Sequence, residues 1–227
     1  MQKPNIVLIV IDSLRFDKCH GNEKSSFTPN IDMLIKNGTY FQETISSAAS
    51  TILAVGSILT GLYPFRNGLG GASYQKLNPN VKTLTKILKD NGYSTYATAP
   101  EIANDFGLTC DFQNPDTVYD NYFSLFSGLG DQILNKFKNS NFKQPYFFYI
   151  HLFDLHSPVI VPPSFNKSEF GMSQYERMIS AIDDWLSKLL EFINLENTIV
   201  ILTSDHGEYI PVLKTENGLI NLESSTS

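Results

Sequence analysis

The chain has 227 residues, of which 42% are hydrophobic, so it is long enough to bury the core of one α/β domain. Its formal net charge of −6 and isoelectric point near 5.2 argue against a surface that binds nucleic acid or an anionic membrane. The apolar run near the N-terminus is too short for the core of a signal peptide or for a membrane span, so we expect a cytoplasmic protein with no membrane partner. Cys19 and Cys110 lie far apart, and two unpaired thiols fit a reducing compartment better than a disulfide.

The first part of the chain begins with a buried strand and continues into helices. Residues 5–11 form a continuous β-branched run, the pattern of a strand covered on both faces. Helices are expected over residues 29–37 and 51–60, because each has a capping residue before it and a glycine after it. Residues 40–45 between them are predicted as a further strand.

The later segments continue the alternation of helix and strand. Helices are predicted over residues 81–90, 132–137 and 173–193, and strands over 93–99, 145–152 and 198–202. This order predicts an α/β fold with a largely parallel central sheet that helices cover on both faces. We expect residues 1–209 to form one domain and residues 210–227 to form a polar tail that frays.

Two of the predicted strands end in residues that can bind a metal. Asp12 follows the first strand, and Asp205, His206 and Gly207 follow the last. Ligands of open α/β sheets bind beyond the C-terminal strand ends. One aspartate after a strand is commonly a turn or cap residue, but the two ends together favour a metal site. Carboxylate and imidazole ligands suit Zn²⁺ or Mn²⁺, with Mg²⁺ or Ca²⁺ less favoured.

A hydroxyl residue, Ser50 or Thr51, stands where the helix over residues 51–60 begins. Its structural role would be that of an N-cap. The functional alternative uses the same place, because the positive end of a helix also attracts a phosphate or sulfate group. A metal ion beside that hydroxyl would lower its pKa and make it a nucleophile.

The strand over residues 145–152 leads into a segment with two histidines and an acid. His156 lies in the following loop, where it can donate a proton to a substrate oxyanion or leaving group. His151 lies within the strand pattern and is interpreted as a structural histidine, and the role of Asp154 is left open. Asp183 and Asp184, on the long helix, are expected to face solvent.

These motifs, in this order, resemble the sulfatase/alkaline-phosphatase superfamily and specifically its sulfatase-like branch. The resemblance extends to about residue 209 and is carried by residues 4–17, 28–34, 59–64, 83–93, 151–158 and 183–208. It implies an alkaline-phosphatase-like fold around one divalent ion. The implied metal ligands are Asp12, Thr51, Asp205 and His206. Thr51 takes the place of the catalytic nucleophile and His156 that of the substrate-binding histidine, with Asp154 and His151 as further candidates for contact with the substrate.

The chain departs from the family pattern at informative positions. Sulfatases that form the formylglycine aldehyde need a cysteine or serine followed by a proline and an arginine, whereas residues 51–55 are Thr-Ile-Leu-Ala-Val. Threonine cannot become that aldehyde, and a threonine nucleophile is similar to that of phosphodiesterase and phosphotransferase members. Ser13 stands at the second acidic position of the opening motif, which implies a single metal site.

The sequence therefore predicts a metal-dependent hydrolase or transferase of small-molecule phosphate esters, mainly phosphodiesters, that uses Thr51 as the nucleophile. One alternative is a sulfuric ester hydrolase. Another is a truncated, inactive domain that binds an anion or a metal, because family members continue well past the Asp-His-Gly motif. The sequence leaves the oligomeric state open.

Overall fold

The computed structural model describes residues 3–70, 75–121, 124–139 and 141–208, together with the backbone of residues 212–215 and 218–221. Within these residues a five-stranded sheet has the order β3-β2-β4-β1-β5, and every neighbouring pair of strands in it is parallel. The strands are β1 (Asn5–Ile11), β2 (Ser94–Pro100), β3 (Val118–Tyr119), β4 (Tyr146–Leu152) and β5 (Thr198–Ser204). The predicted parallel sheet is confirmed, and its central strand β4 is buried along its whole length.

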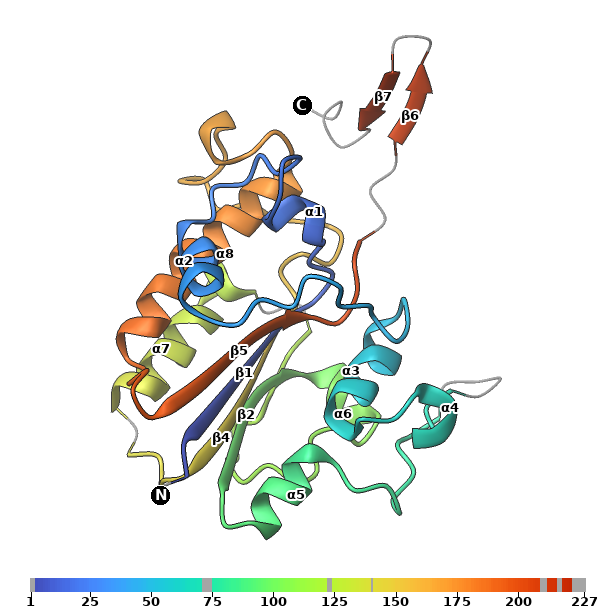
Figure 1. Cartoon of the computed structure of the whole chain (residues 1–227), viewed down its shortest axis with the longest axis vertical. Helices are drawn as coiled ribbons and strands as arrows, with labels where there is room; N and C mark the ends of the chain where they lie inside the picture. Colours follow the sequence, from blue (N-terminus) through green and yellow to red (C-terminus); the bar gives the residue numbers. More distant parts are fainter. Residues whose placement is uncertain are drawn as a thin grey trace.

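Helices cover both faces of this sheet, as predicted (Figure 1). On one face lie α7 (Leu129–Asn139) and α8 (Gln174–Glu191), and α2 (Pro29–Asn37) packs against α8. The other face carries α3 (Thr51–Thr60), α5 (Leu84–Asp90) and α6 (Glu101–Asp105), with α4 (Pro64–Asn67) packed beside α3. The remaining short elements are α1 (Phe16–Cys19), η1 (Leu125–Ser127) and η2 (Ser168–Phe170).

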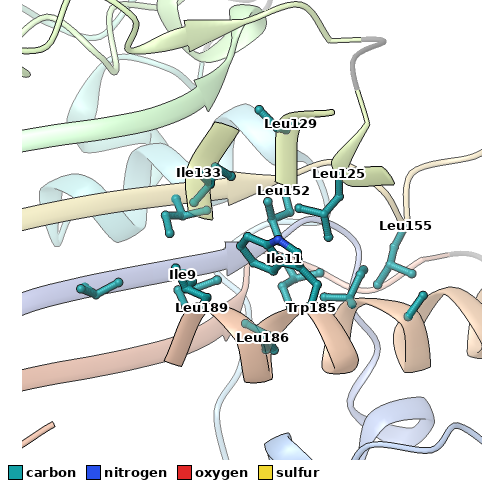
Figure 2. Close-up of a cluster of buried hydrophobic side chains, with 14 of the residues drawn as sticks. Ile9, Ile11, Leu125, Leu129, Ile133, Leu152, Leu155, Trp185, Leu186 and Leu189 are labelled. Atoms are coloured by element: carbon teal, nitrogen blue, oxygen red, sulfur yellow. The ribbon is translucent and has the colours of Figure 1, made fainter. Parts of the chain in front are cut away.

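Each face of the sheet has its own hydrophobic core, because the side chains of a strand alternate between the two faces. Ile9 and Ile11 of β1 point toward α8, where Trp185, Leu186 and Leu189 pack against the sheet (Figure 2). Leu8 and Val10 of the same strand belong to the opposite core, with Ile52, Val55 and Leu59 of α3. The next even-numbered position, Asp12, therefore continues the set that faces α3.

The long helix α8 shows how local sequence sets an element's bounds. The Ser173 hydroxyl oxygen accepts a hydrogen bond from the Glu176 amide at 3.2 Å, and the Glu176 carboxylate accepts one from the Ser173 amide at 3.1 Å. This reciprocal capping box satisfies amides that would otherwise have no partner at the helix start.

Two expectations for individual segments are wrong. Residues 40–45 form no strand: no described strand pairs with them, and Phe41 and Ile45 are 75% and 88% exposed. Asp183 does not face solvent but is buried, and its carboxylate accepts hydrogen bonds from the Asn30 and Ile31 amides at 3.1 and 2.8 Å. It thereby caps the N-terminus of α2, whose first-turn amides have no partner within their own helix.

Other sequence-level expectations concern the ends and the cysteines. Cys19 and Cys110 are both free thiols, as expected. No helix in the described part of the chain combines the length and apolar character needed to cross a bilayer. Within residues 210–227, the backbone forms two antiparallel strands, β6 (Val212–Thr215) and β7 (Gly218–Asn221). The other residues of that segment lie outside the described part, so its fraying stays a prediction.

Candidate metal and nucleophile site

The C-terminal ends of β1, β4 and β5 bring three titratable side chains together. These are Asp12, His151 and Asp205, which are 0%, 0% and 2% exposed. One potential ligand atom from each lies within 4.8 Å of those of the other two. The register explains this, because Val10 of β1 pairs with His151 of β4, and Ile11 pairs with Ser204 of β5.

Asp12 is the residue on which the site converges. Its Oδ1 accepts a hydrogen bond from the Ser13 hydroxyl at 2.7 Å, and its Oδ2 accepts one from the Thr51 hydroxyl at 2.9 Å. Burial acts to raise the pKa of Asp12, but the His151 imidazole 3.8 Å away and the two hydroxyl donors outweigh it and lower that pKa. Asp12 is therefore held as a carboxylate.

A strained turn after β1 links the two carboxylates. Ser13 is fully buried and has a φ of 60°, which is uncommon for a residue other than glycine. Its amide donates to Oδ1 of Asp205 at 3.1 Å. The buried Tyr175 hydroxyl of α8 donates to the Ser13 carbonyl at 2.6 Å and accepts from the Arg15 amide at 2.8 Å. Helix α8 thus fixes the turn that aligns the two carboxylates.

Thr51 begins α3 and points its hydroxyl at the cluster. Its Oγ1 lies 2.9 Å from Oδ2 of Asp12 and 3.2 Å from Nε2 of His206. Ser50, the N-cap residue, makes no side-chain cap hydrogen bond, and the first turn of α3 holds no acidic residue. The amides of that turn and the helix dipole therefore give this end of α3 a positive potential that suits an anion.

His206 is held so that one ring nitrogen faces the cluster. Its Nδ1 lies 2.8 Å from the carbonyl oxygen of Gly207, to which it can only donate. Nε2 is then the nitrogen with a free lone pair, and it lies 3.5 Å from Oδ2 of Asp205. This arrangement matches that of a metal-binding histidine whose second nitrogen is fixed by a carbonyl.

The residues present fit a divalent cation. Oδ2 of Asp205 is buried without a hydrogen-bond partner, and so are both ring nitrogens of His151. Burial, and next the negative charge of Asp12, raise the pKa of Asp205. A bound cation would offset both effects, and the mixture of carboxylate, hydroxyl and imidazole donors suits Zn²⁺ or Mn²⁺.

A pocket of about 500 Å³ opens onto this cluster. Thr51 and His206 line the pocket and also contact Asp12 and Asp205 of the cluster, whereas His156 lines the pocket alone. Nδ1 of His156 lies 3.1 Å from the Ser157 carbonyl, so its Nε2 is the nitrogen free to act on a bound molecule. The remaining lining residues are Ala49, Ser50, Ile52, Ile102 and Phe106.

The structure separates the sequence-predicted residues into three groups. Thr51, His206 and His156 line the pocket, while Asp12 and Asp205 lie buried against Thr51 and His206. His151 lies among the carboxylates and not in the pocket wall.

Asp154 lies in neither the cluster nor the pocket wall. Its Oδ1 accepts a hydrogen bond from the Leu125 amide at 2.8 Å, so in this structure it supports the loop that begins η1.

Asp154 provides a test of pH-dependent stability. Burial raises the pKa of its carboxyl group from the usual 3.8 to about 6. The folded state therefore binds a proton more tightly than the unfolded chain, and stability is lost as the pH rises from about 4 through 6. This shift corresponds to about 3 kcal/mol. We expect Asp154→Asn, which keeps the acceptor for Leu125, to be more stable than wild type at pH 8 by up to this amount. Urea unfolding should show the gap closing toward pH 4, and a gap that does not change with pH would contradict the assignment.

Two features of the site differ from what sequence reasoning predicts. His151 is predicted as a structural histidine or a substrate contact, whereas it lies beside two carboxylates, because it follows Phe147 and Tyr149 on the face toward α3 that Asp12 continues. This alternation was a usable signal. Tyr175 was recognised only as an apolar position of the helix, since no local pattern shows that its hydroxyl reaches the turn after β1.

The chain is similar in sequence to known sulfatases. The family model described as Sulfatase matches residues 4–220. Human steryl-sulfatase is 33% identical over 105 residues, which cover 41% of this chain and 18% of that protein. The ulvan-active sulfatase of Formosa agariphila is 25% identical over 236 residues, which cover 91% of this chain and 45% of that protein. The chain thus spans less than half the length of these curated relatives.

A solved structure with the same fold is the phosphonate monoester hydrolase of Agrobacterium radiobacter. It superposes with a TM-score of 0.70 at 15% sequence identity, covering 96% of this chain and 66% of that one. At this identity the likeness concerns the fold alone. It confirms that the α/β architecture predicted from the sequence is alkaline-phosphatase-like.

Proposed function

Because this chain belongs to the sulfatase family, whose model matches residues 4–220, we propose that it is a metal-dependent hydrolase or transferase of phosphate esters, chiefly phosphodiesters, with Thr51 as the nucleophile. The observation that carries the proposal is the position of the Thr51 hydroxyl. It lies at the N-terminus of α3, in the wall of the pocket, and donates to the Asp12 carboxylate at 2.9 Å.

Members of this family generally depend on a metal ion, and the donors described above would hold one. The ligands would be Asp12, Thr51, Asp205 and His206, and Mn²⁺ or Zn²⁺ suits them better than Mg²⁺ or Ca²⁺. The ion would lower the pKa of the Thr51 hydroxyl and offset negative charge on the transferred group.

In the first half of the reaction, Thr51 attacks the phosphorus atom of the ester. Its hydroxyl proton passes to Oδ2 of Asp12, with which it already shares a hydrogen bond. A new bond forms between Oγ1 and phosphorus as the bond from phosphorus to the leaving alcohol breaks. His156, in its protonated form, donates a proton to the departing oxygen. The N-terminus of α3 offers its amides to the phosphoryl oxygens throughout.

In the second half, water or an alcohol takes the phosphoryl group from Thr51. The neutral His156 accepts the proton of the incoming hydroxyl as its oxygen bonds to phosphorus. The bond between phosphorus and Oγ1 breaks, and Oγ1 recovers its proton from Asp12. Water as the acceptor makes the protein a hydrolase, and a second alcohol makes it a transferase.

The choice of phosphate over sulfate rests on the residue type of the nucleophile. The sulfatase-like resemblance links sulfate-ester hydrolysis to an aldehyde made from cysteine or serine, and Thr51 is neither. Sulfuric ester hydrolysis is the second candidate, because the curated relatives include a steryl-sulfatase and an ulvan-active sulfatase. A pocket that binds an anion suits both esters, so the decision belongs to experiment.

A substrate panel tests this proposal. The Mn²⁺-loaded and Zn²⁺-loaded proteins are assayed with the 4-nitrophenyl ester of phosphate, the bis(4-nitrophenyl) ester of phosphate and the 4-nitrophenyl ester of sulfate. We expect the highest kcat/KM with the diester, and loss of turnover in chelator. Faster turnover of the sulfate ester would establish the second candidate. No turnover of any ester by a folded, metal-loaded protein would favour the alternative of an inactive domain that binds an anion or metal.

A further inference from the structure

His151 is a buried imidazole with no hydrogen-bond partner in the part of the chain that the structure describes. The residue is fully buried on β4, and neither ring nitrogen has a partner among the described residues. Its Nε2 lies 3.8 Å from Oδ2 of Asp12, which is too far for a hydrogen bond. Leaving such polar atoms buried without a partner costs free energy, so their position calls for an explanation.

Aromatic neighbours explain how the His151 ring packs, but they do not provide hydrogen-bond partners for its two nitrogens. Its neighbours include the rings of Tyr149 and Phe153, with centroids 5.9 and 5.1 Å away. Nε2 approaches the carboxylate of Asp12, and one of the two ring nitrogens lies within 4.8 Å of a carboxylate oxygen of Asp12 and of Asp205. Two buried carboxylates and an unpartnered imidazole form an acidic cluster with one imidazole already directed into it.

Ser13, which follows Asp12, does not neutralise the charge of the two carboxylates. Its hydroxyl donates to Oδ1 of Asp12 and its amide to Oδ1 of Asp205. Ser13 therefore organises the two carboxylates and adds no charged donor of its own. The imidazole of His151 reaches the two carboxylates from the neighbouring strand β4, and that of His206 reaches them from the end of β5.

We propose that Nε2 of His151 is a direct ligand of the divalent ion, together with Asp12 and Asp205, and that this second imidazole beside His206 makes the site select Zn²⁺ or Mn²⁺ over Mg²⁺ and Ca²⁺. The inference rests on the metal dependence in the proposed function, adds a ligand to it and assigns the ion preference to the second imidazole. Imidazole ligands favour these transition metals, whereas the two lighter ions prefer sites made of oxygen.

The distances are compatible with one ion. Two ligand atoms bound to one ion at about 2.0–2.2 Å lie at most about 4.4 Å apart, which is twice the bond length. The separation from Asp12 to Thr51 is 2.9 Å, from Thr51 to His206 3.2 Å, and from His151 to Asp12 3.8 Å. The widest separation in the buried triad, at most 4.8 Å, closes with a shift of under about 1 Å.

Pulsed electron paramagnetic resonance of the Mn²⁺-loaded protein tests this directly, because it detects nitrogen atoms bound to the ion. With ¹⁵N-labelled histidine, we expect two imidazole couplings in wild type, one in His151→Gln and one in the matched control His206→Gln. Titration calorimetry should show Zn²⁺ binding at least about tenfold weaker in His151→Gln with a much smaller change for Mg²⁺. A single coupling in wild type that disappears in His206→Gln would overturn the proposal. The number of imidazole couplings in wild type and in His206→Gln tests the proposal even where His151→Gln does not fold.

These readouts separate the inference from the proposed function, since neither requires turnover. Two couplings in a protein that hydrolyses no ester would keep His151 as a ligand and reject the catalytic proposal. One imidazole coupling in a protein that hydrolyses phosphodiesters would keep the catalytic proposal and reject His151 as a ligand. A folded wild-type protein that binds no Mn²⁺ or Zn²⁺ would overturn the assignment of His151.

Discussion

Replacing Thr51 with valine is expected to lower kcat/KM for a phosphodiester by more than about 10³-fold, because valine has nearly the same shape as threonine but no hydroxyl. The loss should fall on kcat, since the wall of the pocket and its positive helix end are retained. Metal affinity should change by less than about tenfold, because the carboxylates supply most of the attraction for the ion. Steady-state kinetics and titration calorimetry on the same samples measure both effects.

Thr51→Ser is the matched control for this substitution. Serine keeps the nucleophilic oxygen and the donor to Asp12, so it should retain a measurable share of the activity. Equal activity in Thr51→Val and wild type would refute the nucleophile assignment. A fall in metal affinity as large as the fall in kcat would indicate that Thr51 acts only as a ligand.

The second large effect is expected at Asp12 and Asp205. Replacing each with asparagine should change the melting temperature of the metal-free protein in opposite directions. Asp205→Asn should weaken Mn²⁺ binding at least about 100-fold and yet raise the melting temperature of the metal-free protein. The reason is that burial and the charge of Asp12 raise the pKa of Asp205, so its ionised form is unfavourable without a metal. Asparagine keeps an oxygen to accept from the Ser13 and His206 amides.

Asp12→Asn is the matched comparison, because the pKa of Asp12 is lowered in the folded state. Its carboxylate is favoured by folding, so its loss should lower the melting temperature while also weakening metal binding.

The raised pKa of Asp205 also predicts how the stability of the metal-free wild type depends on pH. Above the usual 3.8, folded Asp205 retains a proton that the unfolded chain has released, so its contribution to stability is lost as the pH rises through its raised pKa. Calorimetric melting with chelator measures this, and wild-type Mn²⁺ affinity in Asp205→Asn would contradict the site.

The parts of this protein that local sequence determines were predictable. The β-branched run of β1 acts over a few residues and places Asp12 at a strand end, and the apolar period of α8 predicts that helix. The strand β5 likewise places Asp205 and His206 at its end. Asp12 and these two residues lie close together because parallel strands end at the same edge of the sheet.

The parts that depend on distant contacts were not predictable in the same way. Asp183 has the position of a solvent-facing helical residue, and only the packing of α2 on α8 shows that it is a cap. Residues 40–45 have a strand-like composition, but no neighbouring strand pairs with them. His151 lies between these cases. Its place on the strand follows from the local sequence, whereas its closeness to two carboxylates depends on the register of the sheet.

The most direct test of the account is to trap the covalent intermediate. Metal-loaded protein is mixed with a phosphodiester, quenched in acid within the first turnovers and digested for peptide mass spectrometry, with Thr51→Val treated in parallel. We expect an adduct on Thr51 in wild type with the mass of the phosphoryl group and the one ester group that it keeps, and no adduct on the corresponding peptide of Thr51→Val. Turnover of the diester with no adduct on Thr51 at any quench time, or an adduct on another residue that persists in Thr51→Val, would contradict it.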